Sequence, residues 1–468
     1  MTSVIRRDEK VEEEFSGAAL GDARRTRRAQ LIAKRAVENP GAGLPQMAAS
    51  AAELEGMYRL LNSEHITFDA LLAPHIDATL ERAREVGHCL IVHDTTLFEF
   101  PGESHREGLG RTPGKRQGFA SHVALALMPG EARVPLGVCG VINQRRLVSK
   151  NSRSRSWYDM SKDPERESLR WQRLLEEIED RKQGFSCIHL MDREGDIYDL
   201  LALARRRGAR FVIRAAHDRA LSDDESRLRA RLATVAPLAH RDIELSRRSE
   251  RGRTPGARER HPSRSTRAAT IAVGACVVTL RRTQGAHVPE EEITLHAVRV
   301  WEPSPPAGET PVEWMLYTTE PIDSAQAVLA IVDAYRSRWT IEEYFKALKT
   351  GCAFEKRQLE SFHALSNVLA IFLPVAWKLL LARSLCRAHP EAPARTLLAD
   401  VQLTLLMHKL KLAEPPTTAE QATYAIARLG GHLRHNGQPG WQTLGRGLEA
   451  LILMKVGWDA AMNARSDQ

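Results

Sequence analysis

Cysteine is scarce in this sequence, which has six in 468 residues. None lies in a CxxC pair or at a short spacing from a pair of histidines, which argues against a zinc finger and against a disulfide framework. We therefore expect reduced thiols in the core of a cytoplasmic protein. The six are Cys89, Cys139, Cys187, Cys276, Cys352 and Cys386.

Long apolar segments are missing as well. The longest run, Val368–Trp377, has ten residues, contains Pro374 and is followed by Lys378. It is too short and too interrupted to cross a bilayer. Residues 1–15 are charged and lack the apolar stretch of a signal peptide. Export and membrane insertion are therefore not expected.

What the sequence does contain is typical of a globular protein, with 43% apolar and 27% charged residues. Its 67 Lys and Arg exceed its 59 Asp and Glu, which gives a net charge of +8. Arginines crowd residues 24–35, and residues 247–267 hold eight Arg against two Glu. Such clusters neutralise nucleic-acid phosphates, although a solvated surface would produce the same pattern.

The local patterns predict three kinds of structure along the chain. Residues 1–84 have a helical, polar-rich pattern, with Asp22 as the N-cap of the Arg-rich helix. Strands and helices then alternate to about residue 214, which predicts a mixed sheet with helices on its faces. A β-rich insertion is expected over about 235–318, followed by helices to the C-terminus. The expected strands of the sheet are 89–92, 119–127, 134–142, 187–191 and 210–214.

A long helix is predicted over residues 325–349, and its phase places four polar side chains within roughly 60° of one another. Glu343 would point about 100° away from them. Taken alone, such a pattern is more often a solvent-facing stripe, with Arg338 and Glu342 forming an ordinary ion pair. The four are Tyr335, Arg338, Glu342 and Lys349.

Asp94 and Asp192 each follow a short apolar run, so both are expected to close a strand and to face a common crevice. An Asp in such a place is often only a turn former or a helix cap. Together with Glu342, however, the two could hold two Mg²⁺ ions beside a DNA phosphate.

In their order along the chain, these motifs resemble the insertion-sequence-four family of bacterial DDE transposases, whose signature is Y-x2-R-x3-E-x6-K. The resemblance extends to residues 18–26, to His93–Thr96, to Met191–Ile197 and to the residues around Trp314.

The resemblance implies an α/β fold: an RNase H-like mixed-sheet catalytic core with a β-rich insertion, flanked by helical terminal regions. It implies a DNA-binding domain at 1–84, the core at 85–371 and a dimerisation region at 372–468. The implied enzyme is a homodimer in the bacterial cytoplasm, associated with the nucleoid, that cleaves double-stranded transposon ends through a hairpin and joins them to target DNA.

The resemblance also implies roles for single residues. Two Mg²⁺ ions, for which Mn²⁺ can substitute, would be held by the catalytic triad Asp94, Asp192 and Glu342. Alternatives are a non-catalytic regulator that binds transposon ends and a general nuclease on the same core. The remaining assignments are Tyr335, Arg338, Lys349 and Arg214 on DNA phosphates, Trp314 stacked on a flipped base, and Arg24, Arg25, Arg27, Arg28 and Arg59 on transposon-end DNA.

Overall fold

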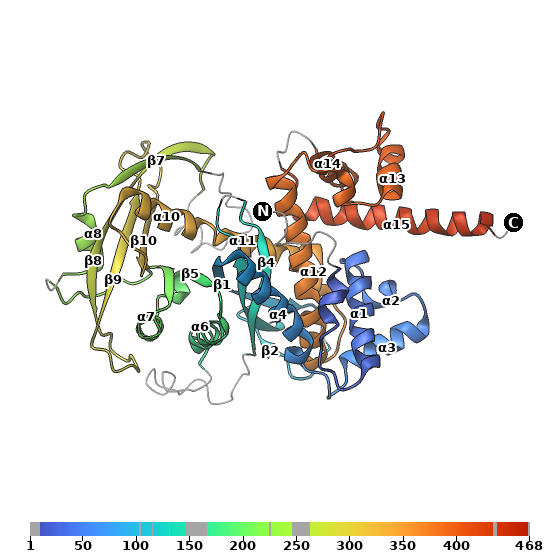
Figure 1. Ribbon diagram of the computed structural model, residues 1–468, viewed down its shortest axis with the longest axis horizontal. Helices are drawn as coiled ribbons and strands as arrows, with labels where there is room; N and C mark the ends of the chain where they lie inside the picture. The colour runs from blue at the N-terminus through green and yellow to red at the C-terminus, as the bar shows by residue number, and fades with distance from the viewer. Residues whose placement is uncertain are drawn as a thin grey trace. The chain divides into compact units, whose positions relative to one another are not determined.

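The computed structural model describes residues 10–145, 166–223, 226–245, 263–433 and 438–466, apart from residues 103, 115 and 131. The chain divides into two compact units, and Figure 1 labels many of their helices and strands. Unit 1 comprises residues 1–155, 180–186 and 339–468, and unit 2 comprises residues 156–179 and 187–338. The domain boundaries expected at 84 and 371 stay predictions.

The N-terminal part of unit 1 is helical, as predicted. Asp22 is the N-cap of the Arg-rich helix, because its carboxylate accepts the Arg24 backbone N–H at 2.7 Å. Ser50 and Thr67 cap two later helices in the same way. The elements are η1 (Val11–Phe15), α1 (Ala23–Glu38), α2 (Leu44–Met47), α3 (Ala51–Leu61) and α4 (Phe68–Val86).

Unit 1 continues with four strands: β1 (His88–Phe100), β2 (Gly110–Arg111), β3 (Gln117–Leu127) and β4 (Pro135–Gln144). β3 pairs antiparallel with both β1 and β4, so the predicted hairpin is confirmed. The expected end of β1 at Asp94 is wrong. Asp94 lies inside the strand, opposite Val123, because the β-branched and aromatic residues up to Phe100 remain paired with β3.

The C-terminal part of unit 1 is organised around one buried helix, α12 (Phe362–Ala388), which packs against α1, α3, α4, β4 and α14. Among the described residues, only this helix is long and apolar enough to span a membrane, but 89% of its apolar stretch is buried inside the protein. Figure 1 shows α15 as a long helix that carries the C-terminus. The other elements are α11 (Trp339–Lys346), η3 (Ala347–Gly351), η4 (Phe354–Lys356), η5 (Ala394–Thr396), α13 (Asp400–Leu410), α14 (Ala419–Leu429) and α15 (Trp441–Ser466).

Unit 2 contains a sheet in the order β5-β6-β10-β9-β8-β7, in which β5 and β6 are parallel and the other pairs are antiparallel. The predicted β-rich insertion is present in the described part, and it extends the sheet because β10 pairs with β6. The elements are α6 (Leu169–Arg181), β5 (Ser186–Met191), η2 (Arg193–Gly195), α7 (Tyr198–Arg206), β6 (Arg210–Arg214), α8 (Leu228–Ala233), β7 (Ala239–Leu245), β8 (Arg267–Arg281), β9 (Glu292–Trp301), β10 (Glu313–Thr318) and α10 (Ala325–Arg336).

Strand register determines the core of unit 2. Met191, Ile213, Tyr317 and Ala297 are partners on successive strands, so their side chains share one face of the sheet. That face forms a buried cluster with residues of α6, α7 and α8, while α10 packs against β6 and β8. Apart from the two-residue strand β2, the described residues present in chain order the three antiparallel strands β1, β3 and β4, the helix α6, and the parallel strands β5 and β6 joined by α7. The predicted α/β fold with an RNase H-like core and helical terminal regions is confirmed.

The single long helix expected over residues 325–349 is wrong. α10 ends at Arg336, α11 begins at Trp339, and a π-helical turn follows α11. The break has a local cause, because the Ser337 hydroxyl donates to the Asp333 carbonyl at 3.2 Å and so competes with the helical hydrogen bonds. The common phase inferred for Tyr335, Arg338, Glu342 and Lys349 therefore does not exist as one helix face.

A buried ionic network joins η1 to α4 and β4. Glu14 bonds to the His75 imidazole, and Arg82 donates to the Glu14 carboxylate at 2.9 Å. The Val138 backbone N–H donates to His75 Nε2 at 3.1 Å, so the imidazole proton lies on Nδ1 and faces Glu14. Burial acts to raise the pKa of Glu14, but His75 and Arg82 outweigh it and lower the pKa from 4.5 to about 2.

This depressed pKa predicts a pH-dependent stability. The carboxylate is favoured in the folded state, so its contribution is present above pH 4.5 and is lost as the pH falls toward about 2. We expect Glu14→Gln to lower the free energy of unfolding by roughly 3 kcal/mol near neutral pH, and the difference to vanish in strong acid. Urea unfolding of both proteins across this pH range measures the effect. Glu13→Gln, on the exposed side of η1, is the matched control, and equal stabilities of Glu14→Gln and the parent at neutral pH would contradict the prediction.

Candidate functional site

One edge of the unit 2 sheet brings together residues that are distant in sequence. β5 and β6 are parallel and pair Met191 with Ile213, so Asp192 and Arg214, the next residue of each strand, emerge side by side at the carboxyl ends. Asp192 caps the short helix η2, with its Oδ1 accepting the Glu194 backbone N–H at 2.8 Å. The predicted position of Asp192 at a strand end is confirmed.

Two aromatic side chains lie at the same edge. β10 runs antiparallel to β6 and pairs Leu316 with Arg214, which places Trp314 beyond the end of β6 at the same edge. The Trp314 ring lies 6.1 Å from the Tyr335 ring at the end of α10. One side of Trp314 packs against the small apolar cluster of Leu245, Ala269 and Val312, and its side chain is only partly buried.

The charged groups at this edge act on the pKa of Tyr335. Burial raises the pKa of Tyr335, the cations Arg338 and Arg214 oppose that rise, and the charge of Asp192 adds to it. The phenol is therefore protonated at neutral pH and can donate a hydrogen bond. Burial also lowers the pKa of Arg214. Unit 2 thus gathers one carboxylate, two guanidinium groups, a phenol and an indole, a combination suited to a polyanion with exposed bases.

The sequence reasoning overlooked Asp196, which lies in the same motif as Asp192. Asp196 is buried, and its Oδ2 accepts the backbone N–H groups of Ala216 and His217 at 2.7 and 2.9 Å. The Arg219 guanidinium donates to Oδ1 at 2.6 Å. Asp196 therefore holds the loop that follows β6 and Arg214. The sequence feature that could have indicated this role is the position of Asp196 between Gly195 and Ile197, at the end of the Met191–Ile197 motif.

In unit 1, three further predicted residues are grouped around β1. Asp94 lies within the strand, and its Oδ1 accepts the Thr95 backbone N–H at 2.7 Å. Glu342 is in the first turn of α11, which packs against β1. The Lys349 ammonium group donates to the Leu97 carbonyl and lies 5.6 Å from the Phe98 ring.

Glu343, the neighbour of Glu342, has a structural role. Its carboxylate accepts the Trp441 indole N–H at 2.9 Å and forms ion pairs with Arg383 and Lys346. Burial raises the pKa of Glu343, but these partners outweigh it and the pKa is lowered. Glu343 thus joins α11 to α12 and α15.

The N-terminal arginines are only partly available for DNA. Arg24, Arg27 and Arg59 are exposed, although Arg24 pairs with Asp22 and Arg59 pairs with Glu55. Arg25 donates to the Leu20 carbonyl, and Arg28 lies over Gly56 of α3, where a side chain at position 56 would collide with it. In the second basic cluster, residues 246–262 lie outside the described residues, and Arg267 pairs with Glu302.

Comparison with known proteins gives two family matches. Residues 7–66 match the family described as transposase DNA-binding, and residues 157–373 match the family described as transposase DDE domain. Among solved structures, the chain is similar to the piggyBac transposase in a synaptic complex with hairpin DNA. That similarity has a TM-score of 0.29 and 9% sequence identity, and it covers 97% of this chain and 74% of the other.

The hydrogen bonds of Asp196 predict that replacing one of its carboxylate oxygens by an amide nitrogen destabilises the protein. Asp196→Asn keeps the shape but replaces an acceptor of several hydrogen bonds by an amide, so we expect a loss of roughly 2 to 4 kcal/mol in the free energy of unfolding. Asp242→Asn, at an exposed position on β7, should change it by less than about 0.5 kcal/mol. Denaturant unfolding monitored by circular dichroism compares the two, and equal losses would contradict the role of Asp196.

Proposed function

We propose that this chain, whose residues 7–66 match the transposase DNA-binding family and whose residues 157–373 match the transposase DDE domain family, is a DDE transposase that moves its element by a cut-and-paste reaction. Within that group, the Y-x2-R-x3-E-x6-K residues resemble the insertion-sequence-four family and transposon-five transposase. The observation that carries the proposal is the edge of unit 2, where Asp192 lies beside Arg214, Tyr335, Arg338 and Trp314.

The proposed metal ligands fit hard divalent cations. Asp94, Asp192 and Glu342 offer only carboxylate oxygens, the donors that Mg²⁺ prefers, and all three are partly exposed. The backbone N–H groups of Thr95 and Glu194 donate to the carboxylates of Asp94 and Asp192 and orient them. Two Mg²⁺ ions, for which Mn²⁺ can substitute, would supply activation of the attacking oxygen and stabilisation of the leaving oxygen at phosphorus.

The surrounding side chains would position the DNA. Arg214 and Arg338 can each donate two hydrogen bonds to a phosphate, Tyr335 can donate one, and Lys349 can act as a point charge. Trp314 has the partly exposed indole that stacking on a flipped base requires. These contacts suit an end that is nicked, closed into a hairpin, reopened and joined through its 3′-OH to target DNA.

We further propose that the chain acts as a homodimer on paired transposon ends in the bacterial cytoplasm, associated with the nucleoid. The distal part of α15 supports a dimer because it exposes several large apolar side chains, which soluble proteins usually cover. They are Leu453, Val456, Trp458 and Met462.

The catalytic proposal is tested on DNA that carries the element's own terminal inverted repeats. We expect Asp94→Asn, Asp192→Asn and Glu342→Gln each to lower Mg²⁺-dependent cleavage about a thousandfold, since metal-assisted charge stabilisation contributes several kcal/mol. Binding to the repeats should persist. Glu194→Gln, an exposed neighbour of Asp192, is the control and should cleave like the parent.

Other outcomes of the same assay would contradict the proposal. A parent protein that binds the repeats with Mg²⁺ present and never cuts them would be the non-catalytic regulator. Cleavage without preference for the repeats would identify a general nuclease.

Light scattering of the protein with two end duplexes measures the number of subunits, and a single copy in that complex would overturn the dimer.

The end-binding arginines predict a salt-dependent effect. Arg24→Ala and Arg27→Ala each remove an exposed cation from α1, so each should weaken binding to the repeats and reduce the slope of log affinity against log salt by about one. Arg395→Ala, which removes an equally exposed arginine far along the chain, is the matched control. A salt slope unchanged by both α1 variants would exclude this helix from the DNA interface.

A further inference from the structure

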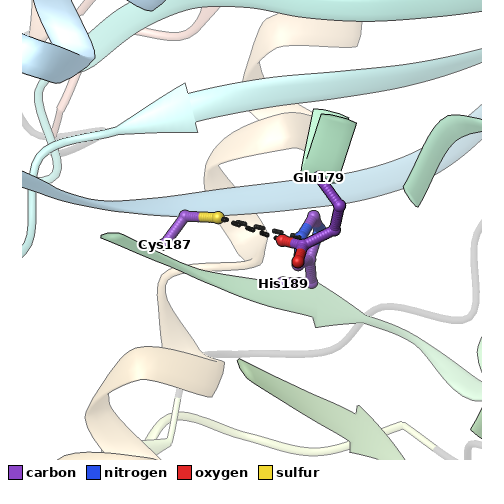
Figure 2. A group of neighbouring side chains, drawn as sticks. All are labelled: Glu179, Cys187 and His189. Atoms are coloured by element: carbon purple, nitrogen blue, oxygen red, sulfur yellow. Dashed lines mark hydrogen bonds and ion pairs between the residues drawn. The ribbon is translucent and has the colours of Figure 1, made fainter. Parts of the chain in front are cut away.

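Three possible metal ligands converge inside unit 2, between α6 and β5. Figure 2 shows Glu179 from α6 and Cys187 and His189 from β5 turned toward one another. Cys187 and His189 are two residues apart on a strand, so both project from the same face. The side chains of Glu179 and His189 are 4% and 0% exposed, and Cys187 is buried as well.

The separations of the donor atoms come within about 0.2 Å of those in a tetrahedral zinc site. His189 Nε2 lies 3.1 Å from Glu179 Oε1, and Cys187 Sγ lies 3.7 Å from His189 Nε2 and 3.8 Å from Glu179 Oε1. With Zn²⁺ bond lengths of about 2.0 to 2.3 Å, neighbouring ligands of a tetrahedral ion are about 3.3 to 3.6 Å apart. An ion about 2.1 Å from the nitrogen and the oxygen and about 2.3 Å from the sulfur is compatible with these separations, and it lies out of the plane of the three atoms, as in a tetrahedral site.

The chemistry of the three donors favours zinc over magnesium. A thiolate and an imidazole are soft or borderline ligands, which suit Zn²⁺, whereas Mg²⁺ requires oxygen donors. The thiolate and the carboxylate together carry two negative charges, so a bound divalent ion would make the buried group neutral overall. Neutrality matters here because a buried net charge is costly.

We propose that Glu179, Cys187 and His189 bind one Zn²⁺ ion that fastens α6 to β5. The strand that supplies two of the ligands ends at Met191 and presents Asp192 directly afterward. The ion would therefore stiffen the strand that positions Asp192, and it uses none of the residues proposed to hold Mg²⁺. The competing description is a hydrogen-bonded Glu179–His189 pair that never binds metal.

Cobalt spectroscopy on the full-length protein tests the site without any assay of DNA cleavage. After chelator treatment, addition of Co²⁺ should produce a thiolate-to-cobalt charge-transfer band in the near ultraviolet and the visible bands of a tetrahedral ion, at one equivalent. Zn²⁺ should displace these bands, and protein purified without chelator should contain one zinc per chain by mass spectrometry. Absence of the charge-transfer band at excess Co²⁺ would overturn the proposal.

Variants identify the ligands. Cys187→Ser should abolish the charge-transfer band, and Glu179→Gln or His189→Gln should weaken Co²⁺ binding by at least about a hundredfold, since loss of even an outer-shell partner costs 10- to 100-fold. Cys276→Ser, which alters a half-buried cysteine of the same unit, is the matched control and should keep the band. Asp94→Asn should keep it as well, which separates this site from the proposed Mg²⁺ ligands. A band that survives in Cys187→Ser would contradict the assignment, and the titration of the parent protein decides the question even if a variant fails to fold.

Discussion

The pairing of β6 with its two neighbours is the constraint on which the functional edge of unit 2 depends. β6 is parallel to β5 and antiparallel to β10, and these registers bring the end of β5, the end of β6 and the start of β10 to one edge. A slip of one residue would exchange the two faces of the strand. Ile213 would then leave the core, and Arg214 would be turned away from Asp192 and Tyr335. The same strand register therefore determines both the core of unit 2 and the positions of its candidate site residues.

In unit 1 the comparable constraint is enclosure of α12. A helix that is apolar on every side must be covered on every side, and α12 is covered by elements from the N-terminal helices, the strands and the C-terminal helices. Its Trp377 shows how this is done, because the indole donates to the Pro135 carbonyl of β4 at 2.9 Å and stacks with Arg82 of α4. The Arg82 contact with Glu14 then extends the same network to η1.

Local sequence patterns predicted a secondary-structure element correctly where neighbouring residues determine its start or its end. Asp22 caps its helix, the hairpin of β3 and β4 forms, and Asp192 follows a short apolar strand. The same reasoning failed for Asp94. The length of β1 is determined by its pairing with β3, and that pairing continues past Asp94 to Phe100. It failed again at Ser337, because helical periodicity is insensitive to one hydroxyl that bonds back to the preceding turn.

By itself, the sequence determined which chemical groups are available and in what order: the carboxylates, the Arg-rich helix and the motifs that resemble a DDE transposase. Only the tertiary structure decided which of these groups are neighbours. In the folded protein Asp196 accepts hydrogen bonds from the loop after β6. Cys187, which the sequence analysis treated only as a core thiol, lies beside His189 and Glu179. The reason is physical, because periodicity reports the conformation of adjacent residues, whereas strand register and the packing of α6 on β5 depend on contacts that no local pattern records.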